Sequence, residues 1–216
     1  MDKRFAIFDM DGTLVDSMVF WKHLAEEFLL GKGVRNIAPE ILERIKPMTM
    51  TESAALFRQE YGLAGTAEEL AVEMNAMMDR HYRSDIPLKS GAAAYLSALA
   101  RRGVTMCVAS ATAQELMAAC LDRLGVAHYF SFLLSCEAVG AGKDRPDVYL
   151  AAARQLNAPP EEIAVYEDAL YAAKTAKEAG FYTVAVPDES SRQHWETLTA
   201  LTDETILDWQ QAAQAQ

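Results

Sequence analysis

Two aspartates separated by a single residue follow an apolar run near the start of the chain. Residues 4–8 lead into Asp9, Met10 and Asp11. In an extended strand end, side chains two residues apart point to the same side, so Asp9 and Asp11 share one side while Met10 points into the core. Such a pair can divide chemical work, because one carboxylate can attack an electrophile while its neighbour moves a proton.

The two residues that follow this pair suit an anionic ligand. Gly12 lets the backbone approach a phosphate closely, and the Thr13 hydroxyl can donate a hydrogen bond to a phosphoryl oxygen. An isolated Asp-Gly pair is usually a simple turn. The functional interpretation therefore depends on what the ends of the other strands contribute.

A regular alternation of short apolar runs and helical patterns places those strand ends. We expect strands over residues 4–9, 104–109, 132–136, 163–167 and 182–186. Between and after them we expect helices over residues 90–103, 112–124, 146–156 and 170–180, and a helical tail over 190–213 with a break near 201–205. This order predicts an α/β fold with a Rossmann-like, mainly parallel sheet sandwiched by helices. Such sheets bind ligands at the carboxyl ends of their strands.

Polar residues stand at several of these carboxyl ends. Ser110 follows the second expected strand, Lys143 lies in the loop after the third, and Glu167 and Asp168 end the fourth. Carboxylates gathered at one edge repel each other and need a cation. Oxygen ligands select a hard ion, and Mg²⁺ accepts water and phosphate in its shell. Ser110 can donate to phosphoryl oxygens and Lys143 can neutralise their charge.

Residues 16–88 interrupt the alternation with helical patterns alone. The four candidate helices fall within residues 16–33, 39–46, 51–62 and 66–83, and the last opens with the capping-box spacing of Thr66 and Glu69. A helical block between the first strand and the rest of a sheet is typical of an inserted domain whose two ends lie close together. We therefore predict a catalytic core of residues 1–15 and 89–216 and a helical cap of residues 16–88.

Composition excludes some partners. The 216 residues carry a net charge of -11, which disfavours nucleic acid and anionic membrane as partners and requires local cations for any anionic substrate.

Cys107, Cys120 and Cys136 are widely spaced and fit reduced, buried thiols of a cytoplasmic protein. The first residues contain no long apolar stretch, so we expect neither a signal peptide nor a membrane anchor. The sequence leaves the oligomeric state open, with a monomer as the default expectation.

The strand-end residues lie in segments that resemble a known family. In chain order, "FDMDGT", "VASAT", "GKDRPDVYL" and "VYEDALYAAKTAKEAGF" resemble the four motifs of the haloacid dehalogenase-like hydrolase superfamily. The helical block after the first motif resembles the cap of the branch that contains β-phosphoglucomutase and phosphoglycolate phosphatase. The resemblance of the cap rests on its position and number of helices.

The resemblance implies a Mg²⁺-dependent phosphatase acting on a small phosphorylated metabolite. Asp9 would be the nucleophile and form an aspartyl-phosphate, and Asp11 would protonate the leaving oxygen and then deprotonate the hydrolytic water. Mg²⁺ would sit between Asp9, the backbone carbonyl of Asp11 and Asp168, with Glu167 assisting directly or through water.

The fourth motif departs from the family pattern at two positions. Ala169 and Ala172 stand where the family usually carries Ser and Gly. We expect altered packing near the metal without loss of a ligand. This departure keeps open an alternative of another class, a phosphate- or partner-sensing module whose catalysis has decayed.

The cap leaves a second alternative open, a β-phosphoglucomutase-like sugar-phosphate mutase. Mutases usually have an aliphatic residue at Thr13, a cap His at Trp21 and an Arg for the distal phosphate at Met50, and the nearby cation here is Lys46. These differences favour the phosphatase. Trp21, Met48 and Met50 either form an apolar substrate-facing surface or pack within the cap, and the surface would suit a small leaving group without dense charge.

Overall fold

The computed structural model describes residues 2–45, 48 and 50–215 of the chain. These residues form two compact units, one running to Ser17 and resuming at Ile86, and the other comprising Met18–Asp85. The smaller unit begins two residues later and ends three residues earlier than the sequence predicted. The linker residues belong to the larger unit because they pair with each other there. Val15 and Leu88 form an isolated antiparallel bridge.

The larger unit is built on a six-stranded sheet in which every neighbouring pair is parallel, with the order β3-β2-β1-β4-β5-β6. Its strands are β1 (Phe5–Phe8), β2 (Thr105–Ser110), β3 (Phe130–Ser135), β4 (Ile163–Glu167), β5 (Tyr182–Ala185) and β6 (Glu204–Thr205). The predicted Rossmann-like parallel sheet is confirmed. The chain reverses its strand order between β3-β2-β1 and β4-β5-β6, so the carboxyl ends of β1 and β4 flank the switch point where such folds bind ligands.

Strand β6 lies where the sequence predicted only a break in a helix. The Asp203 carboxylate before it accepts hydrogen bonds from the backbone N–H and the hydroxyl of Thr183 at 2.8 and 3.1 Å. Lys177 also donates to Asp203 at 2.5 Å. These tertiary contacts fix a strand that is too short for a periodic pattern.

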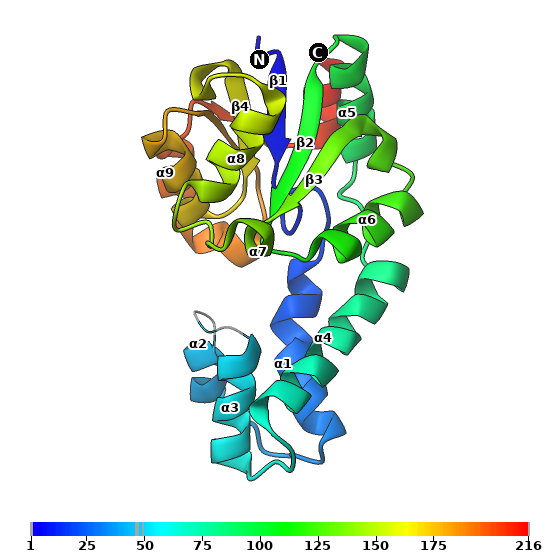
Figure 1. Ribbon diagram of the computed structural model, residues 1–216, viewed down its shortest axis with the longest axis vertical. Helices are drawn as coiled ribbons and strands as arrows, with labels where there is room; N and C mark the ends of the chain where they lie inside the picture. The colour runs from blue at the N-terminus through cyan, green and yellow to red at the C-terminus, as the bar shows by residue number, and fades with distance from the viewer. Residues whose placement is uncertain (1, 46–47, 49, 216) are drawn as a thin grey trace. The chain divides into compact units, whose positions relative to one another are not determined.

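Helices cover both faces of the sheet. They are α5 (Ala92–Arg101), α6 (Gln114–Arg123), α7 (Cys136–Val139), α8 (Asp147–Leu156), α9 (Leu170–Glu178), α10 (Trp195–Leu201) and α11 (Trp209–Gln214). Short 3₁₀ turns occupy Ala127–Tyr129, Pro160–Glu162 and Glu189–His194. Figure 1 shows α8 and α9 on one side of the sheet and α5 and α6 on the other. The short helix α7 was not predicted, and Pro146 caps α8 instead of being its first residue.

Alternate residues of β1 enter two different parts of the core. Ile7 belongs to an apolar cluster on the α8 side that includes Tyr149. Phe8 points to the opposite face, where it stacks on Tyr166 with ring centroids 4.2 Å apart and contacts Trp209 of α11. The central strand is therefore buried on both faces, as expected for a parallel sheet.

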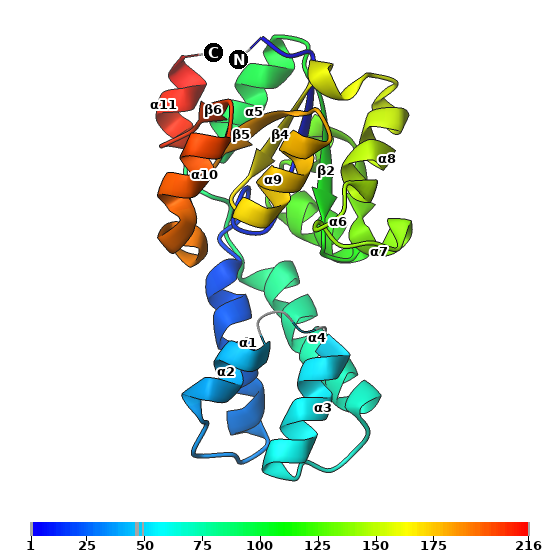
Figure 2. The same cartoon turned by 90° about the vertical axis from the view of Figure 1, so that its left-hand side faces the viewer.

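The smaller unit contains four helices in its described part, as the sequence predicted: α1 (Met18–Gly31), α2 (Pro39–Ile45), α3 (Met50–Tyr61) and α4 (Ala67–Ser84). The predicted capping box at the start of α4 is confirmed, with reciprocal hydrogen bonds between Thr66 and Glu69. Figure 2 shows α1 beside α4. Trp21 and Tyr82 join these two helices through a 3.0 Å hydrogen bond from the indole N–H to the phenol.

The three cysteines are free and buried, as expected. Across the described residues, every helix is too short or too polar to cross a membrane.

Candidate active site

The first aspartate stands at the carboxyl end of β1, where the chain leaves the sheet. The backbone N–H of Asp9 donates to the Tyr166 carbonyl at 3.0 Å and so extends the pairing of β1 with β4. Met10 is fully buried, and its carbonyl accepts hydrogen bonds from the N–H groups of Leu14 and Val15 at 2.8 and 3.0 Å. This tight turn holds Asp9 at the edge of the sheet while the chain departs toward the smaller unit.

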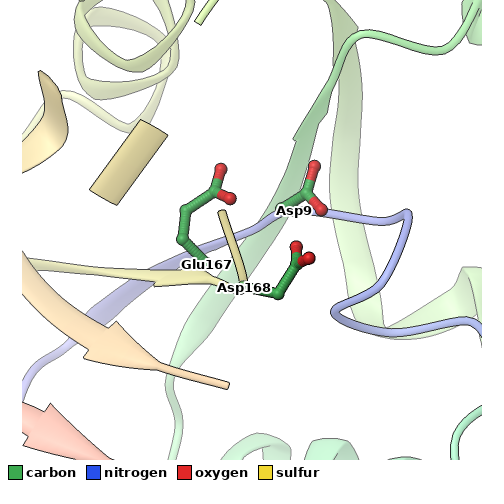
Figure 3. Close-up of side chains that lie close together, drawn as sticks. All are labelled: Asp9, Glu167 and Asp168. Carbon is green, nitrogen blue, oxygen red and sulfur yellow. The ribbon is translucent and has the colours of Figure 1, made fainter. Parts of the chain in front are cut away.

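Three carboxylates from neighbouring strand ends converge at this edge. Asp9, Glu167 and Asp168 each offer an oxygen atom, and the three oxygens lie within 4.8 Å of one another. All three residues are buried, and Figure 3 shows their carboxylates directed toward a common space. The Asp11 side chain is not part of this group. We call Asp9, Glu167 and Asp168 the acidic cluster.

Lys143 places one positive charge in the acidic cluster. It is buried, and its Nζ donates to Asp9 and, at 2.6 Å, to Oε1 of Glu167. Burial alone disfavours the charged ammonium, but the Asp9 and Glu167 carboxylates outweigh burial and raise the pKa of Lys143 well above its ordinary value. The lysine is therefore charged, and one cation faces three carboxyl groups.

The remaining negative charge makes the acidic cluster bind protons or cations. Burial raises the pKa of Asp9 well above its usual range, an effect that Lys143 opposes. Burial, followed by the charge of Glu167, raises the pKa of Asp168 to about 7. A buried group of oxygen donors with excess negative charge fits a hard divalent cation. Asp9, Glu167 and Asp168 are the side chains that can hold it.

Gly12 and Thr13 shape the space around Asp168. Gly12 has a φ of 82°, and a Cβ atom added there would lie 2.6 Å from Oδ2 of Asp168. The Thr13 hydroxyl donates to Oδ1 of the same carboxylate at 3.1 Å. Thr13, expected from the sequence to bind phosphate, is thus engaged with the acidic cluster in this structure.

Three hydroxyl groups donate hydrogen bonds to the Asp11 carboxylate. Its Oδ1 accepts from Ser17 at 2.6 Å, and its Oδ2 accepts from Thr112 at 2.6 Å and from Ser110 at 3.2 Å. Ser110 stands at the end of β2, as expected, and its oxygen accepts from the Thr112 N–H at 3.1 Å. Asp9 therefore contacts the ammonium group of Lys143, whereas Asp11 accepts hydrogen bonds from hydroxyl groups.

Sequence reasoning assigned no role to three residues that the structure brings to these groups. Ser17 and Thr112 contact Asp11, and Tyr149 donates from its hydroxyl to Oε1 of Glu167 at 2.6 Å. The position of Thr112, two residues after Ser110 in the same strand-end loop, could have indicated a contact with Asp11. The position of Tyr149, on the buried face of α8 and close to the Lys143 loop, could have indicated a contact with the acidic cluster.

The sequence matches the family model of haloacid dehalogenase-like hydrolases over residues 4–180. The protein belongs to this family. It is 30% identical over 195 residues to (DL)-glycerol-3-phosphatase 1, mitochondrial, of Arabidopsis thaliana, a match that spans 84% of this chain and 63% of that relative. It is 28% identical over 191 residues to 6-phosphogluconate phosphatase of Escherichia coli, spanning 87% and 85% of the two chains.

A solved structure of a family member shares the fold. A family IA hydrolase of this superfamily from Entamoeba histolytica superimposes with a TM-score of 0.80 at 17% sequence identity, covering 96% of this chain and 94% of that one. The likeness extends over both units of the chain.

The two departures from the haloacid dehalogenase-like pattern fall outside the acidic cluster. Ala169 is the N-cap residue of α9, where its side chain makes no capping hydrogen bond, and Ala172 is fully buried in that helix. A serine at position 169 would cap the helix. The departures therefore concern the start of α9, and the side chains of the acidic cluster are intact.

The residues that we considered for substrate specificity lie in the smaller unit. Trp21 is half-buried and bonded to Tyr82, Met50 is the half-buried first residue of α3, and Met48 is exposed. Lys46 lies outside the described residues.

Proposed function

We propose that the protein is a Mg²⁺-dependent phosphatase of small phosphomonoesters that works through an aspartyl-phosphate on Asp9. One observation carries the proposal. Asp9 lies in a buried cluster suited to a metal and a phosphate, whereas the carboxylate of Asp11, two residues away, accepts hydrogen bonds from hydroxyl groups, which orient it for proton transfer. Family membership and the named phosphatases among the relatives support the same function.

The two aspartates divide the reaction. Asp9 attacks phosphorus, so that a bond forms between its carboxylate oxygen and phosphorus as the bond to the leaving oxygen breaks. Asp11 gives its proton to that leaving oxygen. It then takes a proton from a water molecule that attacks the phosphoryl group, which releases phosphate and regenerates the Asp9 carboxylate. The proton that Asp11 loses in the first step is restored in the second.

The other residues of the site manage charge. Asp9, Glu167 and Asp168 would hold the cation, joined by the backbone carbonyl of Asp11 as the family resemblance implies. Bound Mg²⁺ would offset the repulsion between the anionic nucleophile and an anionic phosphate. Lys143 adds a second positive charge beside Asp9, and the Ser110 hydroxyl can turn from Asp11 to a phosphoryl oxygen.

The substrate is a small phosphorylated metabolite, with Trp21, Met48 and Met50 as candidates for contacting its leaving group. The named activities of the relatives make glycerol 3-phosphate and 6-phosphogluconate the first compounds to test. Trp21, Met48 and Met50 offer indole and thioether groups, which favour a compact leaving group with little charge of its own.

Hydrolysis of p-nitrophenyl phosphate tests the proposal. We expect turnover that requires Mg²⁺ and disappears in Asp9→Asn, and a screen of phosphorylated metabolites would then identify the substrate. Absence of turnover, with binding of phosphate retained, would support the decayed sensing module instead. Conversion of β-glucose 1-phosphate to glucose 6-phosphate without release of phosphate would support the mutase.

A further inference from the structure

Tyr149 contributes a polar atom to an apolar part of the core. The side chain is fully buried and belongs to the apolar cluster between α8 and the sheet, and its ring lies 6.1 Å from that of Phe181. Phenylalanine would fill this space without a polar atom to satisfy. The hydroxyl instead donates to Oε1 of Glu167 at 2.6 Å, so the hydrogen bond of this tyrosine is made to a residue of the acidic cluster.

Both hydrogen bonds to the Glu167 carboxylate reach the same oxygen. Oε1 accepts from Tyr149 and from Lys143, each at 2.6 Å. Within the described part of the chain, no donor contacts Oε2. Two donors on one oxygen fix the rotation of the carboxylate and leave the other oxygen to face a cation or its water ligand.

The two donors differ in what else they contact. Lys143 also contacts Asp9, and the proposed reaction requires its charge at the phosphoryl group. Tyr149 donates to no second carboxylate of the acidic cluster, its ring centroid lies 5.8 Å from Nζ of Lys143, and its neutral hydroxyl adds no charge to the site.

We propose that Tyr149 is a positioning residue that holds Glu167 oriented toward the metal while Lys143 engages the phosphate. This inference rests on the proposed function, because it assigns a role within the same metal site. It predicts that removing the hydroxyl weakens Mg²⁺ binding far more than it weakens the fold.

The test compares Tyr149→Phe with Tyr95→Phe as a matched control. Tyr95 is also buried against the sheet and also loses one buried hydrogen bond, a 2.8 Å contact with the hydroxyl of Tyr166, but it has no contact with the acidic cluster. For each protein, the Mg²⁺ concentration at half-maximal effect is measured twice: from hydrolysis of p-nitrophenyl phosphate, and from the rise in melting temperature of the metal-free protein.

We expect Tyr149→Phe to raise both half-maximal concentrations about tenfold, the lower end of the range for residues that orient metal ligands, and Tyr95→Phe to leave both unchanged. Unchanged values in Tyr149→Phe, or an equal change in Tyr95→Phe, would overturn the proposal. If Tyr149→Phe does not fold, Tyr149→Met, which also lacks a donor, takes its place in the same comparison.

A double-mutant cycle separates positioning from a direct effect. Because Tyr149 acts through Glu167, adding Tyr149→Phe to Glu167→Gln should change the Mg²⁺ dependence of the melting temperature no further. A full additional loss in the double variant would contradict the proposal. Failure of the wild-type protein to hydrolyse any phosphomonoester would refute the proposed function, whereas the melting experiment would still report whether Tyr149 supports metal binding.

Discussion

A methyl group on Gly12 would lie 2.6 Å from Oδ2 of Asp168, so the turn after the first aspartate fits against the acidic cluster only as glycine. Asp168 also accepts a hydrogen bond from Thr13 on the same turn. Gly12, which follows the two aspartates, and Asp168, which follows β4, are therefore packed as one unit, and moving either displaces the other.

Gly12→Ala should therefore lose activity as well as stability. The left-handed backbone costs about 1 kcal/mol for alanine, and a displaced Asp168 should lower kcat/KM about 100-fold. Gly103→Ala is the matched control, because Gly103 has a similar φ of 77° with no atom within 4 Å of an added Cβ. Phosphatase assays and thermal melting measure both effects. Equal activity of the two variants would contradict the predicted contact.

The stability of the metal-free protein should fall as the pH rises from about 4 to about 7. Burial, followed by Glu167, raises the pKa of Asp168 from 3.8 to about 7. Between these values the folded protein binds more protons than the unfolded chain, so deprotonation costs a few kcal/mol of unfolding free energy. Asp9 acts in the same direction. Melting temperatures across this pH range provide the measurement.

Asp168→Asn is the control for that pH dependence. This variant lacks one of the two carboxyl groups whose pKa is raised, so its melting temperature should vary less with pH. In the wild-type protein, saturating Mg²⁺ should reduce the decline of the melting temperature, because the cation binds the ionised carboxylates. A wild-type melting temperature that rises between pH 4 and pH 7 in the absence of metal would show that the acidic cluster does not carry excess negative charge.

Asp11→Asn and Asp168→Asn should fail for different reasons. The first removes proton transfer and should lower turnover of an alkyl phosphate about 10²- to 10⁴-fold, yet Mg²⁺ should still raise its melting temperature. The second should lose most of the Mg²⁺ effect, because Asp168 belongs to the acidic cluster. Thermal melting with and without Mg²⁺ compares them. An equally complete loss in both variants would contradict the division of labour between the aspartates.

Thr112→Val should slow turnover without affecting the metal. Thr112 donates to Oδ2 of Asp11 at 2.6 Å, and losing a hydrogen bond that orients this carboxyl group should lower kcat about tenfold. The Mg²⁺ dependence should match the wild type. Thr175→Val removes an exposed hydroxyl that contacts a backbone carbonyl and should leave kcat unchanged. A raised Mg²⁺ requirement in Thr112→Val would place this threonine in the metal site.

The parallel sheet made much of the fold predictable. Strand β4 was predicted with its observed bounds, because a continuous apolar run between two helical patterns is characteristic of a strand covered on both faces. The same logic identified the strand ends that carry Asp9, Ser110 and Asp168. Since parallel strands end at one edge, residues that are far apart in the sequence could be expected to meet there.

What the sequence could not reveal depended on side-chain reach and tertiary contact. Ser17, Thr112 and Tyr149 carry ordinary hydroxyl groups, and nothing in their spacing shows which carboxylate each one contacts. The engagement of Thr13 with Asp168 follows from the turn at Gly12, whose close approach to that carboxylate is a tertiary contact. In the cap, an apolar residue such as Trp21 has the same pattern whether it packs between helices or faces a substrate.

Trapping the intermediate on the first aspartate tests directly whether Asp9 is the nucleophile. The p-nitrophenolate leaving group needs no protonation, so Asp11→Asn should still be phosphorylated by p-nitrophenyl phosphate but should hydrolyse the intermediate slowly. Acid quenching followed by peptide mass spectrometry should then find one phosphoryl group on Asp9, and none on the protein when Asp9→Asn is added. A phosphoryl group on another residue, or its persistence in the double variant, would contradict Asp9 as the nucleophile.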